Sequence, residues 1–273
     1  MASYRPEMTD EGIHSLHSTT VLDELGKARE LSLTGEKPLT IYLDKREIVT
    51  LMTMGAQPEL LTLGYLRNQG LVAKLEDIVA IQVDWDVDAV AVTTRKARTD
   101  LDQILSKRTV TSGCGQGTMF GNVMDSLKEL SLHCPPFSAE KVYQVLEGVN
   151  EYNKMYKQAG AVHGCALCVD EQVAIFVEDV GRHNAVDAIS GWMWLNAVSG
   201  ADKVFYTTGR LTSEMVIKVA QMQVPLLLSR SGVTEMGLRL AKQIGIGMVA
   251  RAKGKHFLVY SGQEQFESPV QTN

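Results

Sequence analysis

Apolar and polar residues alternate along the first third of the chain in a way that predicts strands around one helix. PLTIYLDKREIVTLMTM (38–54) predicts a β-hairpin in which DKR forms the turn. PELLTLGYLRNQGLV follows with leucines at helical spacing, Pro58 near its start and Gly70 at its close, so it predicts an amphipathic helix. The valine- and isoleucine-rich segment 77–94 predicts strand, turn and strand.

The second half alternates between strand-like and helix-like segments. After CPPF, Ser138 opens SAEKVYQVLEGVNEYNKMYKQAG as a predicted helix, and AVHGCALCV and VAIFVED predict paired strands around DEQ. Three predicted helices follow, HNAVDAISGWMWLNAV, LTSEMVIKVAQMQ and TEMGLRLAKQIG. They alternate with the predicted strands KVFYTTG, PLLLS and IGMVAR, and a last predicted strand, KHFLVYS, ends the series. This alternation predicts an α/β sheet with helices on its faces.

The length of 273 residues fits one large domain or two closely packed lobes. We expect a polar, partly mobile N-terminal tail over 1–36. An N-terminal β-rich lobe over 37–135 would end in a cysteine loop and a helix at about 121–132. An α/β lobe would follow over 136–262, with a C-terminal tail over 263–273.

The amino-acid composition argues against several classes of protein. Hydrophobic residues make up 45% and charged residues 22%, as in a soluble globular protein, and the net charge of −5 provides no global basic surface for nucleic acid. There is no apolar run of the roughly 20 residues that a membrane span needs, and no signal core, so we expect a cytoplasmic protein. Four cysteines in so long a chain predict reduced thiols.

One cysteine stands in a glycine-rich loop. TSGCGQGTMFGN (111–122) surrounds Cys114 with four glycines. Such a loop brings a thiolate close to a bulky substrate, and its N–H groups lower the thiol pKa. The loop has no second cysteine, which argues against a dithiol oxidoreductase. An acyl carrier, a protease-type nucleophile and a persulfide carrier stay open, as does a turn that simply carries a cysteine.

Three strand–turn–helix segments follow one another in the second half. VEDVGRHNAVDAISGW places Asp179, Arg182 and His183 after a strand, where α/β folds bind ligands. The spacing alone slightly favours the alternative, an ion pair that pins the loop. TTGRLTSEMVIKVA repeats the design with Arg210, and LSRSGVTEMG repeats it with Thr234 as a potential helix cap. The three turns could converge on one ligand rim, or each could serve only to cap its helix.

The densest positive cluster is ARAKGKHF (250–257). A basic, glycine-containing turn between two strands suits phosphate binding, and the alternative is a solvated hairpin tip.

HGCALC contains Cys165 and Cys168, which would point to opposite faces of a strand. We therefore expect buried apolar cysteines rather than a dithiol or half of a zinc site, since no second pair completes four ligands.

The longest of these segments resemble one family. EDVGRHNAVD and TGRLTSEMVIKVAQMQVPLLLSRSGVTEMGLRLAKQIGI resemble the FdhD family, the formate dehydrogenase accessory sulfurtransferases, and the match extends in one order over roughly residues 35 to 262. The resemblance implies a cytidine-deaminase-like mixed sheet with flanking helices, assembled as a homodimer. It also implies a sulfurtransferase that carries sulfur from a cysteine desulfurase to the molybdenum cofactor of the formate dehydrogenase catalytic subunit.

The resemblance also assigns roles to residues. Cys114 falls at the persulfide-bearing cysteine. The substrate would be molybdenum bis(molybdopterin guanine dinucleotide), with no tightly held prosthetic group and no metal site in the protein. The segment that would bind this substrate corresponds to Arg251, Ala252, Lys253, Gly254, Lys255 and His256. Independently of the resemblance, we expect Asp179, Arg182, His183 and Arg210 to line the same cavity.

Two positions depart from the family pattern. Gly117 stands where a second loop cysteine is usual, and Arg251 stands where an aromatic residue is frequent. The alternative is therefore a molybdenum-cofactor-binding chaperone that moves no sulfur, and a weaker one is that Cys165 or Cys168 replaces the missing thiol. The H-x-E and P-C-x-x-C signature of zinc deaminases is absent from the sequence, so deamination is not expected.

Overall fold

A computed structural model describes residues 4–13, 15–106, 108–111, 117–120 and 130–268. Mixed sheets with flanking helices make up the described chain, which confirms the predicted α/β class. Cys114 and most of the helix predicted at 121–132 lie outside the described residues.

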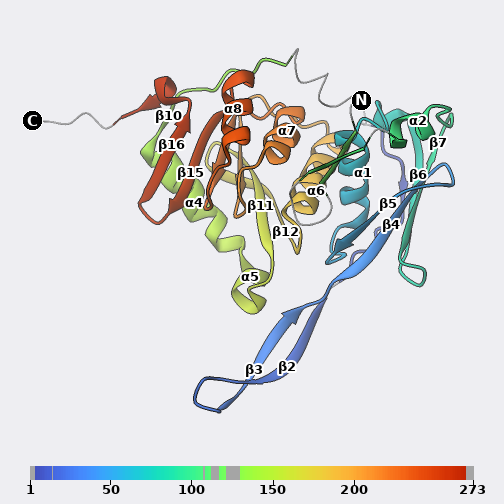
Figure 1. The fold of residues 1–273 in the computed structure, drawn as a ribbon, viewed down its shortest axis with the longest axis horizontal. Coiled ribbons are helices and arrows are strands. Elements are labelled where there is room, and N and C mark those ends of the chain that lie inside the picture. Colours follow the sequence, from blue (N-terminus) through green and yellow to red (C-terminus); the bar gives the residue numbers. More distant parts are fainter. Residues whose placement is uncertain (1–3, 14, 107, 112–116, 121–129, 269–273) are drawn as a thin grey trace, which may run out of the picture.

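The N-terminal lobe contains a five-stranded sheet (Figure 1). Its order is β1 (Glu7–Met8), β6 (Ile78–Asp84), β7 (Ala89–Thr94), β4 (Lys37–Leu43) and β5 (Arg46–Thr53). The predicted 38–54 hairpin is confirmed as β4 and β5, whose turn places Asp44 and Lys45 at φ 48° and 71°, as a type I′ turn requires. The predicted strands in 77–94 are confirmed as β6 and β7.

The C-terminal lobe is built on a six-stranded mixed sheet. β13, β14 and β15 run parallel to one another, and the other neighbours pair antiparallel. The sheet order is β12 (Gln172–Asp179), β11 (His163–Val169), β13 (Lys203–Thr207), β14 (Leu226–Ser229), β15 (Gly247–Lys253) and β16 (His256–Ser261).

Helices cover both faces of this sheet, as the alternating pattern predicted (Figure 1). α4 (Ala139–Tyr152) packs on one face, and its N-cap Ser138 accepts a hydrogen bond from the Lys141 amide, which confirms the predicted start. The other face is covered by α6 (Arg182–Leu195), α7 (Ser213–Gln221) and α8 (Glu235–Ile244).

The remaining elements are short. α5 (Lys154–Ala159) follows α4, α2 (Leu101–Ser106) closes the N-terminal lobe, and two 3-10 turns lie at Leu75–Asp77 and Gln263–Gln265. Two further strand pairs are β8 (Arg108–Thr111) with β9 (Gly117–Phe120) and β10 (Phe137–Ser138) with β17 (Phe266–Glu267). β17 lies within the expected C-terminal tail.

Part of the expected N-terminal tail is ordered in strands. β1 joins the N-terminal sheet, and β2 (Leu16–Leu22) and β3 (Ala28–Thr34) form a hairpin that projects from the body (Figure 1). Apolar positions do not reveal this hairpin, because Leu22 and Leu33 are exposed rather than buried. The local signal is Asp23, whose carboxylate accepts hydrogen bonds from the Leu25 and Lys27 amides and so shapes the turn.

The two lobes meet where α1 (Pro58–Asn68) crosses α6. Gly64 and Gly191 let the helix backbones touch: a Cβ added to Gly64 would lie 1.7 Å from Asp187 O, and one added to Gly191 would lie 2.0 Å from Leu60 O. One apolar core runs through this crossing from the first sheet to the second. The crossing thereby fixes the start of α6, next to the site described below.

Candidate functional site

The basic turn between β15 and β16 is a two-residue turn. Lys253 pairs with His256, and Gly254 has φ +59°, the left-handed conformation that the first central residue of such a turn requires. Just before the turn, Arg251 sits at a bulge with φ 53°, and its amide donates to Ser231 O at 2.9 Å. This bond ties the basic turn to the loop that follows β14.

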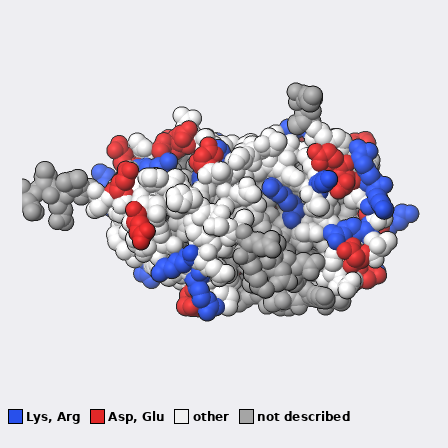
Figure 2. All heavy atoms as spheres, turned by 90° about the horizontal axis from the view of Figure 1, so that it is seen from above, with Lys and Arg blue, Asp and Glu red and all other residues white. Residues whose placement is uncertain are grey.

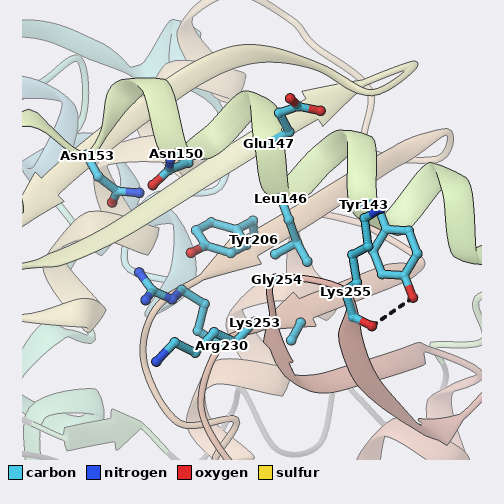
Figure 3. A pocket seen from close by; sticks show the side chains of 11 residues that line it. Tyr143, Leu146, Glu147, Asn150, Asn153, Tyr206, Arg230, Lys253, Gly254 and Lys255 are labelled. Carbon is cyan, nitrogen blue, oxygen red and sulfur yellow. Dashed lines mark hydrogen bonds between the residues drawn. The ribbon is translucent and has the colours of Figure 1, made fainter.

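A cavity of about 410 Å³ lies between this turn and α4 (Figure 3). Of the six residues assigned to substrate binding from the sequence, four line it, whereas Arg251 and His256 are exposed and do not. We call this cavity the first hollow. Its lining residues are Tyr143, Leu146, Glu147, Asn150, Asn153, Tyr206, Arg230, Ala252, Lys253, Gly254 and Lys255.

Two tyrosines and three cations contribute to the wall of the first hollow. The Tyr143 hydroxyl donates to Lys255 O at 3.1 Å (Figure 3). The Tyr143 ring also meets the Phe257 ring edge-on. Tyr206 is 1% exposed, and burial raises its pKa to about 12, although the nearby charge of Arg230 and a hydrogen bond with it act in the opposite direction. A fixed cation beside aromatic rings suits an aromatic ligand that carries phosphate.

A second hollow of about 480 Å³ adjoins the first, because both are lined by Arg230 and Lys253. Each of the three strand–turn–helix segments contributes to it: Val180 follows β12, Thr208 follows β13, and Arg230 and Ser231 follow β14. Its other lining residues are Tyr156, Gly160, Ala161, Val162 and His163.

Hydrogen bonds between the turns explain why they converge. The Arg230 amide donates to Thr207 O at 3.2 Å, and Ser229 Oγ donates to Gly209 O at 2.7 Å. Parallel neighbouring strands bring their carboxyl ends to one edge of the sheet. The predicted convergence is therefore confirmed, while ligand binding at this rim stays a prediction.

His163 is a half-buried group in the second hollow. Its Nδ1 lies 3.3 Å from Thr208 Oγ1. Burial lowers the pKa of His163, and the positive charges of Arg182 and Arg210 lower it further. The imidazole is therefore neutral at pH 7 and offers the hollow a hydrogen-bonding group without charge.

Asp179 ties the two lobes together. Its buried carboxylate accepts hydrogen bonds from Thr53 Oγ1 at 2.5 Å, the Met54 and Gly181 amides and Asn184 Nδ2. Burial raises the pKa of Asp179, although these hydrogen bonds act in the opposite direction. Asp179 does not line either hollow, so the structure favours the interpretation in which it pins the loop.

The other three residues expected to line the cavity also lie outside both hollows. Arg182 is buried, and its side chain packs against Gly209, whereas Arg210 is exposed. His183 Nε2 lies 3.1 Å from Glu214 Oε2, a contact that favours a charged imidazole. Burial and the nearby cations outweigh that contact and lower the pKa of His183 to about 2, so this ring is neutral.

Cys165 and Cys168 point into separate cores on opposite faces of the sheet, as predicted. Both are 0% exposed, and burial raises the pKa of each thiol to about 12. Cys134 packs against Gly247, and burial raises its pKa to about 11. Buried neutral thiols are poor sulfur acceptors, which argues against either strand cysteine replacing the missing loop thiol.

Alkylation tests this arrangement of thiols. In native protein at pH 8, we expect iodoacetamide to modify Cys134, Cys165 and Cys168 about a hundredfold more slowly than in guanidinium chloride, because burial suppresses both thiolate formation and access. Peptide mapping by mass spectrometry at timed intervals measures the rates. Rapid native modification of Cys165 or Cys168 would contradict the buried arrangement.

Several residues of the two hollows were not singled out from the sequence. The LSRSG segment contained Arg230 directly after a predicted strand, which was its only signal. Tyr143, Asn150 and Tyr156 come from the helices before β11, and nothing in their local pattern indicates that they face the basic turn.

Charge elsewhere does not form a broad basic surface on the visible face. Acidic and basic side chains lie mixed toward both ends of the face seen in Figure 2.

Within the described chain, no group of three or more His, Cys, Asp or Glu residues is arranged to hold a metal ion. No helix of the described residues is long and apolar enough to cross a membrane.

Known proteins resemble this chain over nearly its whole length. The profile of the FdhD/NarQ family matches residues 34–267. A sulfur carrier protein FdhD from Halalkalibacterium halodurans is 30% identical over 254 residues, covering 92% of this chain and 94% of its own. One from Wolinella succinogenes is 26% identical over 247 residues, covering 88% and 86%.

A solved structure shows the same fold. The crystal structure of a formate dehydrogenase accessory protein from Desulfotalea psychrophila matches with a TM-score of 0.73 and 26% identity, covering 92% of this chain and 98% of that one. Its agreement confirms the mixed α/β fold with flanking helices described above. Together with the family profile, these matches show that the chain belongs to the FdhD/NarQ family.

Proposed function

We propose that this protein is a sulfur carrier for the maturation of formate dehydrogenase. The names of its relatives support the role, and the first hollow supports a substrate that carries a nucleotide. The single observation that carries the proposal furthest is the cationic cavity formed where the family's substrate-binding segment meets Arg230. Lys253 and Lys255 would hold phosphate groups of molybdenum bis(molybdopterin guanine dinucleotide), the substrate.

The sulfur step would take place at Cys114. Its thiolate attacks the terminal sulfur of a persulfide on a cysteine desulfurase, so that one S–S bond breaks, another forms, and the desulfurase thiolate leaves. The S–S bond of the Cys114 persulfide then breaks, and the Cys114 thiolate leaves while the terminal sulfur passes to the substrate. The reduced metal centre of the substrate would supply the two electrons that convert this sulfur into a bound sulfide, and would itself be oxidised by two electrons. The protein would act in the cytoplasm as a homodimer, between the desulfurase and the catalytic subunit of formate dehydrogenase.

Sulfur labelling tests the step directly. The protein is incubated with a cysteine desulfurase and radiolabelled cysteine, and the label is mapped by non-reducing mass spectrometry. We expect one added sulfur atom on Cys114, none on Cys134, Cys165 or Cys168, and no label in Cys114→Ala. The three buried cysteines act as internal controls.

A cellular readout accompanies the labelling. Formate dehydrogenase produced with Cys114→Ala as its only accessory protein should be inactive, although the variant binds guanine nucleotides as the wild type does. Active enzyme from that background would overturn the transfer step.

A second function is favoured by one position. Gly117 replaces the second cysteine that the family usually has in this loop, so the protein could bind and deliver the cofactor without moving sulfur. Absence of label on Cys114, with nucleotide binding intact, would select this chaperone role over sulfur transfer.

A further inference from the structure

A third hollow lies where α1 and α6 end. α6 begins beside the second hollow and ends at this one, and its 14 residues separate the two by about 20 Å. The volume of about 380 Å³ falls in the range of small-molecule sites. The third hollow shares no lining residue with the other two. It is lined by Tyr4, Arg67, Ala73, Lys74, Leu75, Glu76, Met193, Trp194, Leu195, Ala197 and Val198.

The two helices end in the same way at this hollow. Gly70 after α1 and Ala197 after α6 adopt the left-handed conformation, with φ of 65° and 51°. The amides of the next residues, Leu71 and Val198, each donate at 2.9 Å to the carbonyl oxygen five residues earlier, as in a Schellman motif. These bonds occupy carbonyl oxygens that would otherwise be free to repel an anion.

Arg67, in the last turn of α1, supplies the half-buried cation of the third hollow. Its Nη1 donates to Ser190 O at 3.3 Å, and its guanidinium carbon lies 5.8 Å from the centre of the Trp194 ring. Within the described part of the chain, no carboxylate forms an ion pair with it. Burial lowers the pKa of Arg67, but an arginine stays charged at pH 7. The guanidinium has thus lost part of its hydration without gaining an anionic partner, which a ligand could supply.

The rest of the wall is mainly apolar. Eight of the eleven lining residues are apolar or aromatic, so the body of a ligand would also have to be apolar. Tyr4 is fixed there, because its hydroxyl donates to Ile78 O at 2.5 Å and the Arg95 guanidinium lies 5.4 Å from the centre of its ring. Aromatic rings attract one another edge-on or offset, so the rings of Tyr4 and Trp194 favour an aromatic ligand.

The charge of the hollow favours a carboxylate over a phosphate. Lys74 and Glu76 are exposed and carry opposite charges, which leaves Arg67 to set the sign of the hollow. One half-buried guanidinium balances the single charge of a carboxylate and binds both of its oxygens through parallel N–H groups. A phosphate monoester carries up to two charges at pH 7, and the second would lie unpaired among apolar side chains.

We infer that the third hollow is a binding site for a small aromatic carboxylate. The carboxylate meets Arg67, and the aromatic ring packs among the apolar side chains beside Tyr4 and Trp194. This site is separate from the sulfur-transfer role and gives the protein a second ligand of different chemistry.

Calorimetric titration with indole-3-acetate and its uncharged analogue indole-3-ethanol tests the site. For the wild type, we expect a dissociation constant of about 1 mM or lower for the acid and binding about tenfold weaker for the alcohol. Arg67→Gln should weaken binding of the acid about tenfold to a hundredfold, the range for losing charge-assisted hydrogen bonds. Arg239→Gln is the matched control and should bind the acid as the wild type does, because that arginine lies on α8 with its side chain 65% exposed. Equal affinity of the wild type for acid and alcohol, or unaltered binding of the acid by Arg67→Gln, would overturn the inference.

Photolabelling locates the site in the wild-type protein without any substitution. The probe is 4-benzoylbenzoate, a photoreactive aromatic carboxylate, and labelled peptides are identified by mass spectrometry after irradiation and proteolysis. We expect label within residues 67–76 or 193–198, and its loss when indole-3-acetate is present in excess. Label confined to other segments, or label that indole-3-acetate does not displace, would refute the assignment.

The outcome is separable from that of the sulfur-transfer experiment. Labelling of Cys114 by the desulfurase needs no aromatic acid, so it can succeed when the third hollow binds nothing. Conversely, binding of indole-3-acetate with an unlabelled Cys114 would leave this site intact and remove only the transfer step.

Discussion

Replacing Gly64 by alanine should lower the free energy of unfolding by about 3 kcal/mol, near the upper end of the usual cost of overpacking a core. The added Cβ would lie 1.7 Å from Asp187 O and 2.7 Å from the Gly191 amide nitrogen. These are backbone atoms of α6, so no side-chain rotation can relieve the clash. The two helices must move apart, and the apolar core that passes between the lobes must open with them.

Denaturant titration followed by circular dichroism measures this change, with Gly148→Ala as the control. Gly148 is also inside a helix, but a Cβ there would lie 3.5 Å from the nearest atom outside α4, an ordinary contact distance. Alanine at that position should raise stability by about 0.5–1 kcal/mol through its better helix propensity. Equal effects of the two substitutions would contradict the close crossing of α1 and α6.

The Gly64→Ala substitution should also affect the second hollow. α6 begins at Arg182, directly after the loop that Asp179 pins to Thr53 and Met54, and Val180 of that loop lines the second hollow. Separation of α1 from α6 should therefore disturb the second hollow before the first. The packing of α1 against α6 thus helps to set the geometry of the second hollow.

Local patterns sufficed to predict most of the elements of this fold. The turn at Asp44, the cap at Ser138 and the cap at Thr234, whose hydroxyl accepts from the Gly237 amide, depend on neighbours only a few residues away. The opposite orientation of Cys165 and Cys168 follows directly from the two-residue period of a strand. The turns after β13 and β14 converge because these strands are parallel neighbours, and the turn after β12 reaches the same edge because β11 pairs antiparallel with both β12 and β13.

Features that depend on distant residues were not predictable in this way. The β2–β3 hairpin leaves Leu31 and Leu33, which share one face, about half exposed, so no buried apolar face marks it as part of the packed fold. Tyr143 faces the basic turn only because α4 packs across the sheet from it, and its hydrogen bond to Lys255 O spans 112 residues. Asp179 carries the chemistry of a catalytic carboxylate, but burial and four hydrogen bonds give it a structural role.

Among the charged residues, we expect the buried pair of Asp187 and Lys218 to have the largest effect on the free energy of unfolding. Lys218 Nζ lies 2.5 Å from Asp187 Oδ2, and the two side chains are 2% and 3% exposed. Asn68 Nδ2 donates to the other carboxylate oxygen at 2.7 Å, and Ser190 in turn donates to Asn68. Lys218→Met would leave the carboxylate buried without its cation, which should cost about 4 kcal/mol at pH 8.

The pH dependence of that loss identifies its cause. Burial already raises the pKa of Asp187, and the nearby Lys218 ammonium is what lowers it, so removal of Lys218 should raise the pKa further. A carboxyl group whose pKa is higher in the folded than in the unfolded protein destabilises the fold increasingly as pH rises through the folded pKa. The difference in unfolding free energy between variant and wild type should therefore be larger at pH 8 than at pH 5.

Two further variants distinguish an unpaired buried charge from a simple loss of packing as the cause. Asp187→Asn combined with Lys218→Met should recover most of the stability, because the asparagine is uncharged and its oxygen still accepts from Asn68. Lys242→Met, at an exposed position of α8, should change stability by less than about 0.5 kcal/mol. A loss in Lys218→Met that is independent of pH and not recovered by the double substitution would show that it comes from packing of the methionine between α6 and α7, and would contradict the electrostatic explanation.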